Sequence, residues 1–311
     1  MKRWLRLLGP FLGILFVGGL FAVLAPDTFL TPYNLRTVAT QAVLVALGAM
    51  GMTFVVVSGG IDLSVGSIVA FSAVLSATIV KAGLPPWLAL GIGSLAGALV
   101  GACNGLLVIG LRVVPFLVTL GTMGILRGAA KWLGNETKVD ADPGWLASIM
   151  TKFPEPAWLQ VSLGVWIMLA LALLLGIVLH RSVFGVRCFA VGSNEANARL
   201  CGVPVERTKV SVYALCGALA GLAGVLHFAR LTQGDPTAAL GYELEVIAAV
   251  VIGGGSLAGG EGTVLGSLLG ALLMAILANG CDLIDVSNYV QEMIVGAVIV
   301  VAVALDRYRS R

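Results

Sequence analysis

Long apolar runs alternate with short polar connections along almost the whole chain. The first run, Leu7–Ala25, follows a basic start and is close to the ~20 residues that cross a bilayer as a helix. It exceeds the apolar core of a secretory signal, about 7–15 residues, so we expect a retained first span. Nine further runs lie at about 38–57, 64–80, 87–110, 113–133, 161–179, 209–229, 244–257, 263–279 and 290–305. This pattern predicts an all-α, polytopic membrane protein with about ten transmembrane helices, forming one domain over residues 1–311.

The positions of the charged residues predict the orientation of these spans. Cytoplasmic loops of membrane proteins carry an excess of lysine and arginine. With the amino terminus inside, twelve of the nineteen basic residues are cytoplasmic: Lys2, Arg3, Arg6, Arg112, Arg181, Arg187, Arg199, Arg207, Lys209, Arg307, Arg309 and Arg311. An even number of spans then places both termini in the cytoplasm. Only 11% of the residues are charged, against about a quarter in soluble domains, which excludes a soluble protein.

The composition offers little support for disulfide or metal chemistry. The five cysteines show no CxxC spacing, and Cys188 and Cys201 fall in a loop that we place in the reducing cytosol. The two histidines, His180 and His227, belong to no HExxH-like cluster. We therefore expect neither a disulfide framework nor a metal site.

The cytoplasmic loop 181–209 is one of two long polar interruptions, and it contains the signals of a short helix. Ser193 or Asn194 can accept the free amide hydrogens of a first turn, where Glu195 suits the helix dipole. Gly202 fits the left-handed position after the last turn. Such a helix has roughly two turns and is not stable alone in water. We therefore expect this loop to dock on another protein.

Two glycine-rich segments, Ser58–Gly66 and Gly253–Gly262, are expected to form short hairpins on the inner side. The second lacks the Gly-Lys-Ser/Thr of a phosphate loop, so a tight turn between packed spans is the preferred interpretation. In the first, Asp62 can cap the helix that starts near Leu63, with Ser64 assisting. Alternatively, Asp62 and Ser64 help to transmit motion at a cytoplasmic gate.

The large external loop 134–160 mixes charge, proline and tryptophan, which indicates a structured outer face. Trp145 and Trp158 are expected to anchor the loop at the membrane interface, with a docking role as the alternative. Arg127, near the outer end of its span, is expected to extend to the lipid headgroups.

Glycines recur every four residues in one span and form a smooth ridge on a helix. This spacing predicts close packing between helices of the same chain, with a subunit interface as the alternative. Asn104 lies beside the ridge and is expected to hydrogen-bond between helices or to contact a substrate. The glycines concerned are Gly93, Gly97, Gly101 and Gly105, with shorter sets at Gly217 and Gly221 and at Gly262, Gly266 and Gly270.

The spans carry few ionisable groups, whereas ion-driven transporters usually need them inside the membrane. The notable acids, Asp62, Glu243, Glu245, Glu261 and Glu292, fall at or near span ends. No nucleophile–base pair is evident, which argues against a membrane enzyme. The pattern favours a conduit that takes its energy from a partner. A secondary transporter or channel is the alternative from a different class.

Five segments in a fixed order carry a resemblance to a known family. They are GGIDLSVGS (59–67), NGLLVIGLRVVPFLVTLGTMGILRG (104–128), VGSNEANARLCGV (191–203), KVSVYALCGALAGLAG (209–224) and PTAALGYELEVIAAVVIGGGSLAGGEGTVLG (236–266). From about Asn34 to the carboxyl end, the chain resembles the permease subunits of bacterial ATP-binding-cassette importers for monosaccharides. These form the ribose-type group, which is related to the branched-chain amino-acid permeases. A branched-chain amino-acid or nucleoside permease of the same architecture is the alternative within the resemblance.

The resemblance implies a multi-pass permease of the bacterial inner membrane that works in a complex. Two permeases, identical or related, form a dimer whose interface holds the path of a ribose-like pentose or a hexose. Two cytoplasmic ATPases use ATP and magnesium, and an extracytoplasmic binding protein delivers the sugar. The chain itself is expected to bind no cofactor and no nucleic acid and to have no catalytic site.

The resemblance also implies roles for particular residues. The segment SNEANARLCGV matches the coupling helix that fits a cleft of the ATPase, which assigns coupling to Asn194, Glu195, Ala198, Arg199 and Gly202. The segment VPFLVTLGTM matches a wall of the pathway, where Phe116, Thr119 and Thr122 are expected to share one face. Ordinary packing, with each threonine bonding to the preceding turn, is the alternative for these three residues.

Overall fold

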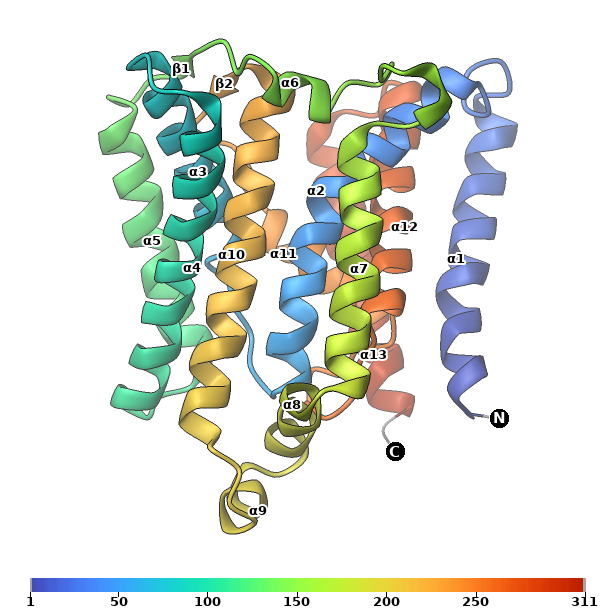
Figure 1. Cartoon of the computed structure of the whole chain (residues 1–311). Helices are drawn as coiled ribbons and strands as arrows, with labels where there is room; N and C mark the ends of the chain where they lie inside the picture. Colours follow the sequence, from blue (N-terminus) through green and yellow to red (C-terminus); the bar gives the residue numbers. More distant parts are fainter. Residues whose placement is uncertain (1, 310–311) are drawn as a thin grey trace.

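The computed structural model describes residues 2–309, which form a bundle of long helices (Figure 1). The long helices are α1 (Lys2–Leu24), α2 (Pro32–Val57), α3 (Val65–Lys81), α4 (Pro86–Leu111), α5 (Pro115–Leu133), α7 (Leu163–Arg181), α10 (Val205–Leu231), α12 (Val264–Leu283) and α13 (Asn288–Arg309). The shorter elements are β1 (Val139–Asp140), α6 (Leu146–Ile149), a 3-10 turn (Ala157–Leu159), α8 (Val183–Ser193), α9 (Glu195–Leu200), β2 (Gln233–Gly234) and α11 (Tyr242–Ile252).

The start of α1 and the end of α13 lie on the same side of the bundle, and α9 protrudes from that side (Figure 1). This agrees with the predicted even number of crossings and with a cytoplasmic loop at 181–209. The side chains of Lys2, Arg3, Arg6, Arg307 and Arg309, and all of Arg311, lie outside what the structure describes. Their share of the charge argument therefore stays a prediction.

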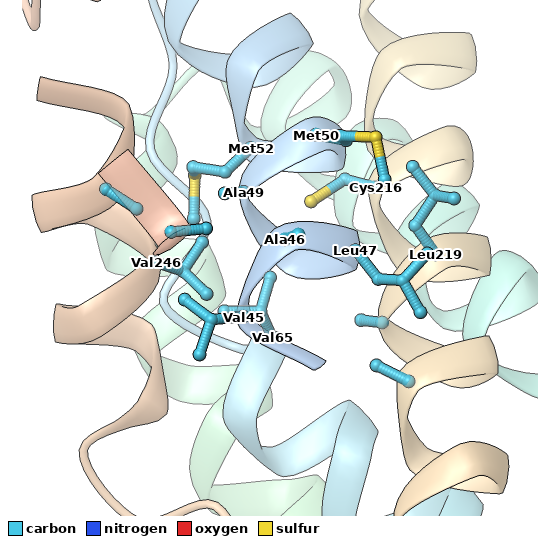
Figure 2. Packing of buried hydrophobic residues seen from close by; sticks show 14 of the residues in the cluster. Val45, Ala46, Leu47, Ala49, Met50, Met52, Val65, Cys216, Leu219 and Val246 are labelled. Atoms are coloured by element: carbon cyan, nitrogen blue, oxygen red, sulfur yellow. The ribbon is translucent and has the colours of Figure 1, made fainter. Parts of the chain in front are cut away.

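Helix α2 forms the centre of the bundle. Every residue from Ala42 to Val57 is buried, because α10, α11 and α12 pack around it. Figure 2 shows Leu47 and Met50 of α2 lying towards α10, while Met52 lies on the side of α11. An apolar helix buried on all sides needs no polar face, and this explains the continuous hydrophobic run in the sequence.

The predicted glycine ridge packs α4 against α10, within the same chain. A Cβ added to Gly97 would overlap the carbonyl oxygen of Gly217, and one added to Gly217 would overlap that of Gly97. The ridge of α12 is also covered, because a Cβ on Gly270 would overlap the backbone of Ala249 in α11. The prediction of intramolecular packing is confirmed for these glycines.

Five described helices, α2, α4, α7, α10 and α12, are long and apolar enough to cross a membrane by length and composition. The prediction of a full span at 244–257 is wrong. Helix α11 has only 11 residues, about 16 Å at 1.5 Å per residue, which is half of a ~30 Å hydrocarbon layer. The chain reaches α11 through the irregular segment 235–241, and such backbone is tolerated at membrane depth where protein surrounds it.

The external loop is structured, as predicted. Strand β1 pairs with β2 in antiparallel register, and Lys138 forms an ion pair with Asp235 at 3.1 Å. Burial alone would raise the pKa of Asp235, but hydrogen bonds from Thr237 and Lys138 outweigh burial and lower it. Trp145 and Trp158 are both exposed, which suits the predicted interface anchors.

The expectation that Arg127 extends to the headgroups is wrong. Its guanidinium donates to the carbonyl oxygens of Pro236 at 2.9 Å and Ala238 at 2.6 Å. Arg127 of α5 therefore holds the segment 235–241 that leads into α11. The sequence could not indicate this, because the carbonyls lie more than a hundred residues away along the chain.

Candidate functional site

The predicted short cytoplasmic helix is present as α9. Asn194 is the cap, and its Oδ1 accepts from the amide of Asn197 at 2.9 Å. Gly202 has a φ of 78°, the left-handed conformation predicted from its position. The amide of Val203 then donates to the carbonyl oxygen of Ala198 at 3.0 Å, which completes a Schellman-type end. Both ends of α9 are thus fixed by local hydrogen bonds.

Ion pairs connect α9 to the first turns of α10. Glu195 accepts from Lys209 at 2.6 Å and lies 3.5 Å from Arg199, and Arg199 also pairs with Glu206. The hydrogen bond from the Arg199 guanidinium to Glu206 raises the pKa of Arg199. Single surface ion pairs are worth little, but a linked set fixes the direction in which α9 points. The two charged residues predicted to act in coupling therefore also bind α10.

The cytoplasmic loop contains a second helix, α8, which the sequence analysis missed. Ser182 caps it by accepting from the amide of Gly185 at 3.1 Å. Phe184, Cys188 and Val191 recur at helical spacing, and this was the signal that could have revealed it. The Phe184 ring stacks on Phe54 of α2 at 5.9 Å between centroids. Burial raises the pKa of the Cys188 thiol to about 12, so this thiol is not reactive at neutral pH.

Helix α9 has an inner and an outer face. Ala198 is buried against Val191 of α8 and Val205 of α10, so it can act only by holding the helix in place. Leu200 is 86% exposed, although it is apolar, and the sequence analysis did not single it out. A cavity of about 990 Å³ separates α9 from the turn between α4 and α5, where Val114 is exposed. The outer face is therefore open to a partner.

The segment 58–64 connects α2 to α3, as the predicted hairpin would, but most of it lies inside the bundle. It turns at Ser58 and Gly59, continues without regular structure over 60–62 and turns again before α3, and Asp62 is 0% exposed. The Asp62 carboxylate accepts from the amide of Ser64 at 2.9 Å and from its hydroxyl at 2.6 Å. The prediction that Asp62 caps α3 is therefore wrong, because Ser64 occupies the cap position and makes no side-chain capping bond, while Asp62 binds Ser64 from two residues before it. The gate role of Asp62 and Ser64 stays a prediction.

Asn104 and Thr119 complete this buried polar cluster. Asn104 Nδ2 of α4 donates to Ser64 Oγ at 2.9 Å, which confirms the predicted hydrogen bond between elements. Thr119 Oγ1 of α5 accepts from the amide of Leu63 at 3.1 Å. Both side chains are fully buried, so a contact with substrate would require α4 or α5 to move.

The three residues expected on one face of α5 do not share one surface. Thr119 points into the cluster, whereas Phe116 is 41% exposed. Thr122 is partly buried and donates to the carbonyl oxygen of Thr119 at 3.1 Å, the backbone contact considered for a packing role. Farther along α5, Gly121, Gly124 and neighbouring apolar side chains face open space. This open face of α5 lies beyond the part of the bundle that packs on α3 and α4.

These features define the class of protein. A bundle of long apolar helices, five of them long and apolar enough to cross a bilayer, is the architecture of a multi-pass membrane protein. The chain belongs to the family described as branched-chain amino acid transport system permease component, whose model matches residues 34–303. It is accordingly a multi-pass permease of the bacterial inner membrane.

The relatives in this family include sugar permeases. The chain is 40% identical to the ribose import permease of Bacillus subtilis (strain 168), over 97% of this chain and 93% of the relative. It is 37% identical to an L-arabinose permease of Azospirillum brasilense (93% and 85%). It is 34% identical to a D-allose permease of Escherichia coli (strain K12) (97% and 92%). No solved structure matches the chain.

Proposed function

We propose that this chain is the transmembrane subunit of an ATP-driven importer and moves a monosaccharide, a ribose-like pentose or a hexose, into the cell. Similarity to ribose, arabinose and allose permeases over nearly the full length carries this proposal. The alternative of a branched-chain amino-acid or nucleoside substrate is less well supported, because these relatives are named for sugars.

The energy comes from a cytoplasmic ATPase that uses ATP and magnesium, and the permease contributes no catalytic group and binds no cofactor. The ATPase docks on α9. Leu200 supplies an exposed apolar contact, while Asn194 and Gly202 fix the two ends of the helix. Glu195 and Arg199 set the direction of the helix through their ion pairs with α10. Such a rigid, capped projection suits a partner that pushes on it.

The sugar path lies between this chain and a second permease, which is an identical or related copy. The open face of α5 supports this arrangement, since its glycines and exposed side chains have no partner among the described residues. In the present conformation Thr119 and Asn104 are enclosed. Movement of α5 away from segment 58–64 exposes Thr119 and Asn104 to the sugar path. Asp62 and Ser64 meanwhile hold the start of α3 in place. An extracytoplasmic sugar-binding protein delivers its ligand to the structured outer loop 134–160.

The test is purification from the native membrane followed by transport in proteoliposomes. We expect an ATPase to co-purify in equal amount, and uptake of labelled D-ribose, L-arabinose or D-allose to require ATP and the added binding protein. Leucine and adenosine serve as competing probes for the alternative substrates. A chain that elutes alone and moves sugar without ATP, but stops when ion gradients are collapsed, would overturn the proposal in favour of a secondary transporter.

A further inference from the structure

Three segments that are distant in the chain meet at the cytoplasmic end of α2. They are the start of segment 58–64, the end of α8 and the loop 253–263 before α12. Figure 1 shows α8 lying under the cytoplasmic end of α2, and the two helices are in contact. The meeting point consists of Gly59, Gly192, Gly259 and Gly260, which we call the glycine junction.

The contacts at the glycine junction join backbone to backbone. The amide of Gly260 donates to the carbonyl oxygen of Val57 at 2.9 Å. A Cβ added to Gly192 would overlap that same oxygen and lie 2.7 Å from the Gly260 nitrogen. One added to Gly259 would lie 2.6 Å from the Gly192 oxygen and 3.0 Å from the Gly59 Cα. A side chain at Gly192 or Gly259 would therefore force the three segments apart.

One side of the glycine junction leads to the coupling helix. Gly192 follows Val191 directly, and Val191 packs with Ala198 and Val205 in a small apolar cluster. Helix α8, helix α9 and the start of α10 are therefore tied together by this cluster and by the ion pairs of Glu195. A force applied to α9 reaches Gly192 without crossing a flexible linker.

The other side of the glycine junction leads to the buried polar cluster. Gly59 and Gly60 lie near the start of segment 58–64, and a Cβ on Gly60 would lie 2.5 Å from Tyr213 Oη. Two residues farther on, Asp62 holds the end of α3, and Leu63 is bound by Thr119. Because only two residues separate Gly59 from Asp62 and the segment is fixed at that far end, a displacement at Gly59 shifts the polar cluster itself.

We propose that the glycine junction is a rigid joint that carries the movement of the coupling helix to segment 58–64, with Gly192 as its positioning residue. The proposal rests on the function proposed above. Backbone contacts suit this task, because close-packed groups without side-chain rotamers transmit a displacement instead of absorbing it. Movement of α9 then reaches the bundle through α8 as well as through α10, into which the chain continues.

The first test is Gly192→Ala, compared with Gly176→Ala in α7, where an added Cβ meets no heavy atom within 4 Å. For Gly192→Ala we expect the ATPase to co-purify in unchanged ratio and ATP hydrolysis to continue, while sugar moved per ATP falls at least tenfold. Gly176→Ala should match the wild type. A folded Gly192→Ala protein with wild-type sugar moved per ATP would overturn the proposal.

A second test does not depend on the folding of that variant. An ideal Cβ on Gly260 lies 3.5 Å from Ser193 Cβ, within the range of a disulfide. Ser193→Cys with Gly260→Cys, in a background with the exposed Cys103 and Cys201 changed to serine, should cross-link and transport equally well oxidised or reduced. Failure to cross-link, or uptake that is blocked by oxidation and restored by a reductant, would mean that the segments separate or slide. If the wild type itself shows no ATP-dependent uptake, the proposed function fails instead.

Discussion

The carboxylate of Glu195 accepts a hydrogen bond from the Lys209 ammonium group at 2.6 Å, across the turn between α9 and α10. Lys209 is mostly covered, whereas the Glu195 side chain is about half exposed. The pair therefore joins the protruding helix α9 to the bundle. Both charges are already paired within this chain, without any partner protein. A role in docking and a role in holding α9 can be separated by exchanging the two charges.

Glu195→Lys alone should weaken association with the ATPase about tenfold, which corresponds to ~1.4 kcal/mol. The substitution removes the ion pair with Lys209 and places a second positive charge beside Lys209 and Arg199. The exchanged pair Glu195→Lys with Lys209→Glu should recover most of that loss, since the internal contact is restored. The amount of ATPase that co-purifies at increasing salt concentration measures the association of the single variant and of the exchanged pair. Glu136→Lys on the outer side is the matched control and should change nothing. No recovery in the exchanged pair would indicate that Glu195 contacts the ATPase directly.

Leu200→Ala should leave the fold intact and reduce ATPase association about 30-fold. Leu200 is 86% exposed, so its loss costs no packing within the chain, while an apolar anchor at an interface is typically worth ~2 kcal/mol. The ratio of ATPase to permease after purification and the melting temperature of the permease alone measure the two effects. Leu240→Ala, which removes the same kind of apolar side chain, 70% exposed, on the outer side, is the control. Equal losses in the two variants would contradict a docking role for Leu200.

Ser64→Ala should destabilise the bundle by about 1–3 kcal/mol, because it leaves the Asn104 amide and the Asp62 carboxylate each with one hydrogen bond fewer in a buried site. Thermal unfolding in detergent measures the change. Ser148→Ala on the exposed outer loop removes a local hydrogen bond and should stay within about 0.5 kcal/mol of the wild type. A Ser64→Ala protein as stable as this control would mean that water replaces the lost hydroxyl.

Local signals made much of this molecule predictable. The ends of α9 are fixed by Asn194 and Gly202, whose preferences depend on backbone conformation within a few residues. The glycine spacing of α4 predicted close packing because it forms a ridge on any straight helix. These features need no knowledge of what lies across the bundle.

The remaining features depend on contacts between distant parts of the chain. Segment 58–64 resembles a surface turn in composition, and only the surrounding helices bury most of it. Helix α11 is an exception, because Gly241 and Gly253 at its two ends are local signals of its short length that the apolar run at 244–257 obscured. The open face of α5 has the same apolar composition as a lipid-facing surface, so the sequence alone does not distinguish the two.

The outer end of α5 provides a last prediction. Arg127 donates to the carbonyl oxygens of Pro236 and Ala238, and these charge-assisted bonds are worth about 1.5–3 kcal/mol each. Arg127→Met keeps the apolar part of the side chain and should raise hydrogen exchange in residues 235–241 at least tenfold. Lys138→Met breaks only the ion pair of the exposed Lys138 with Asp235 and should have a much smaller effect, since ion pairs at the surface contribute about 0–1 kcal/mol. Because segment 235–241 leads into the short helix α11, its release in Arg127→Met should also spread to the first turn of α11. Exchange that changes equally in both variants, or in neither, would show that the β1–β2 pairing holds this segment without Arg127.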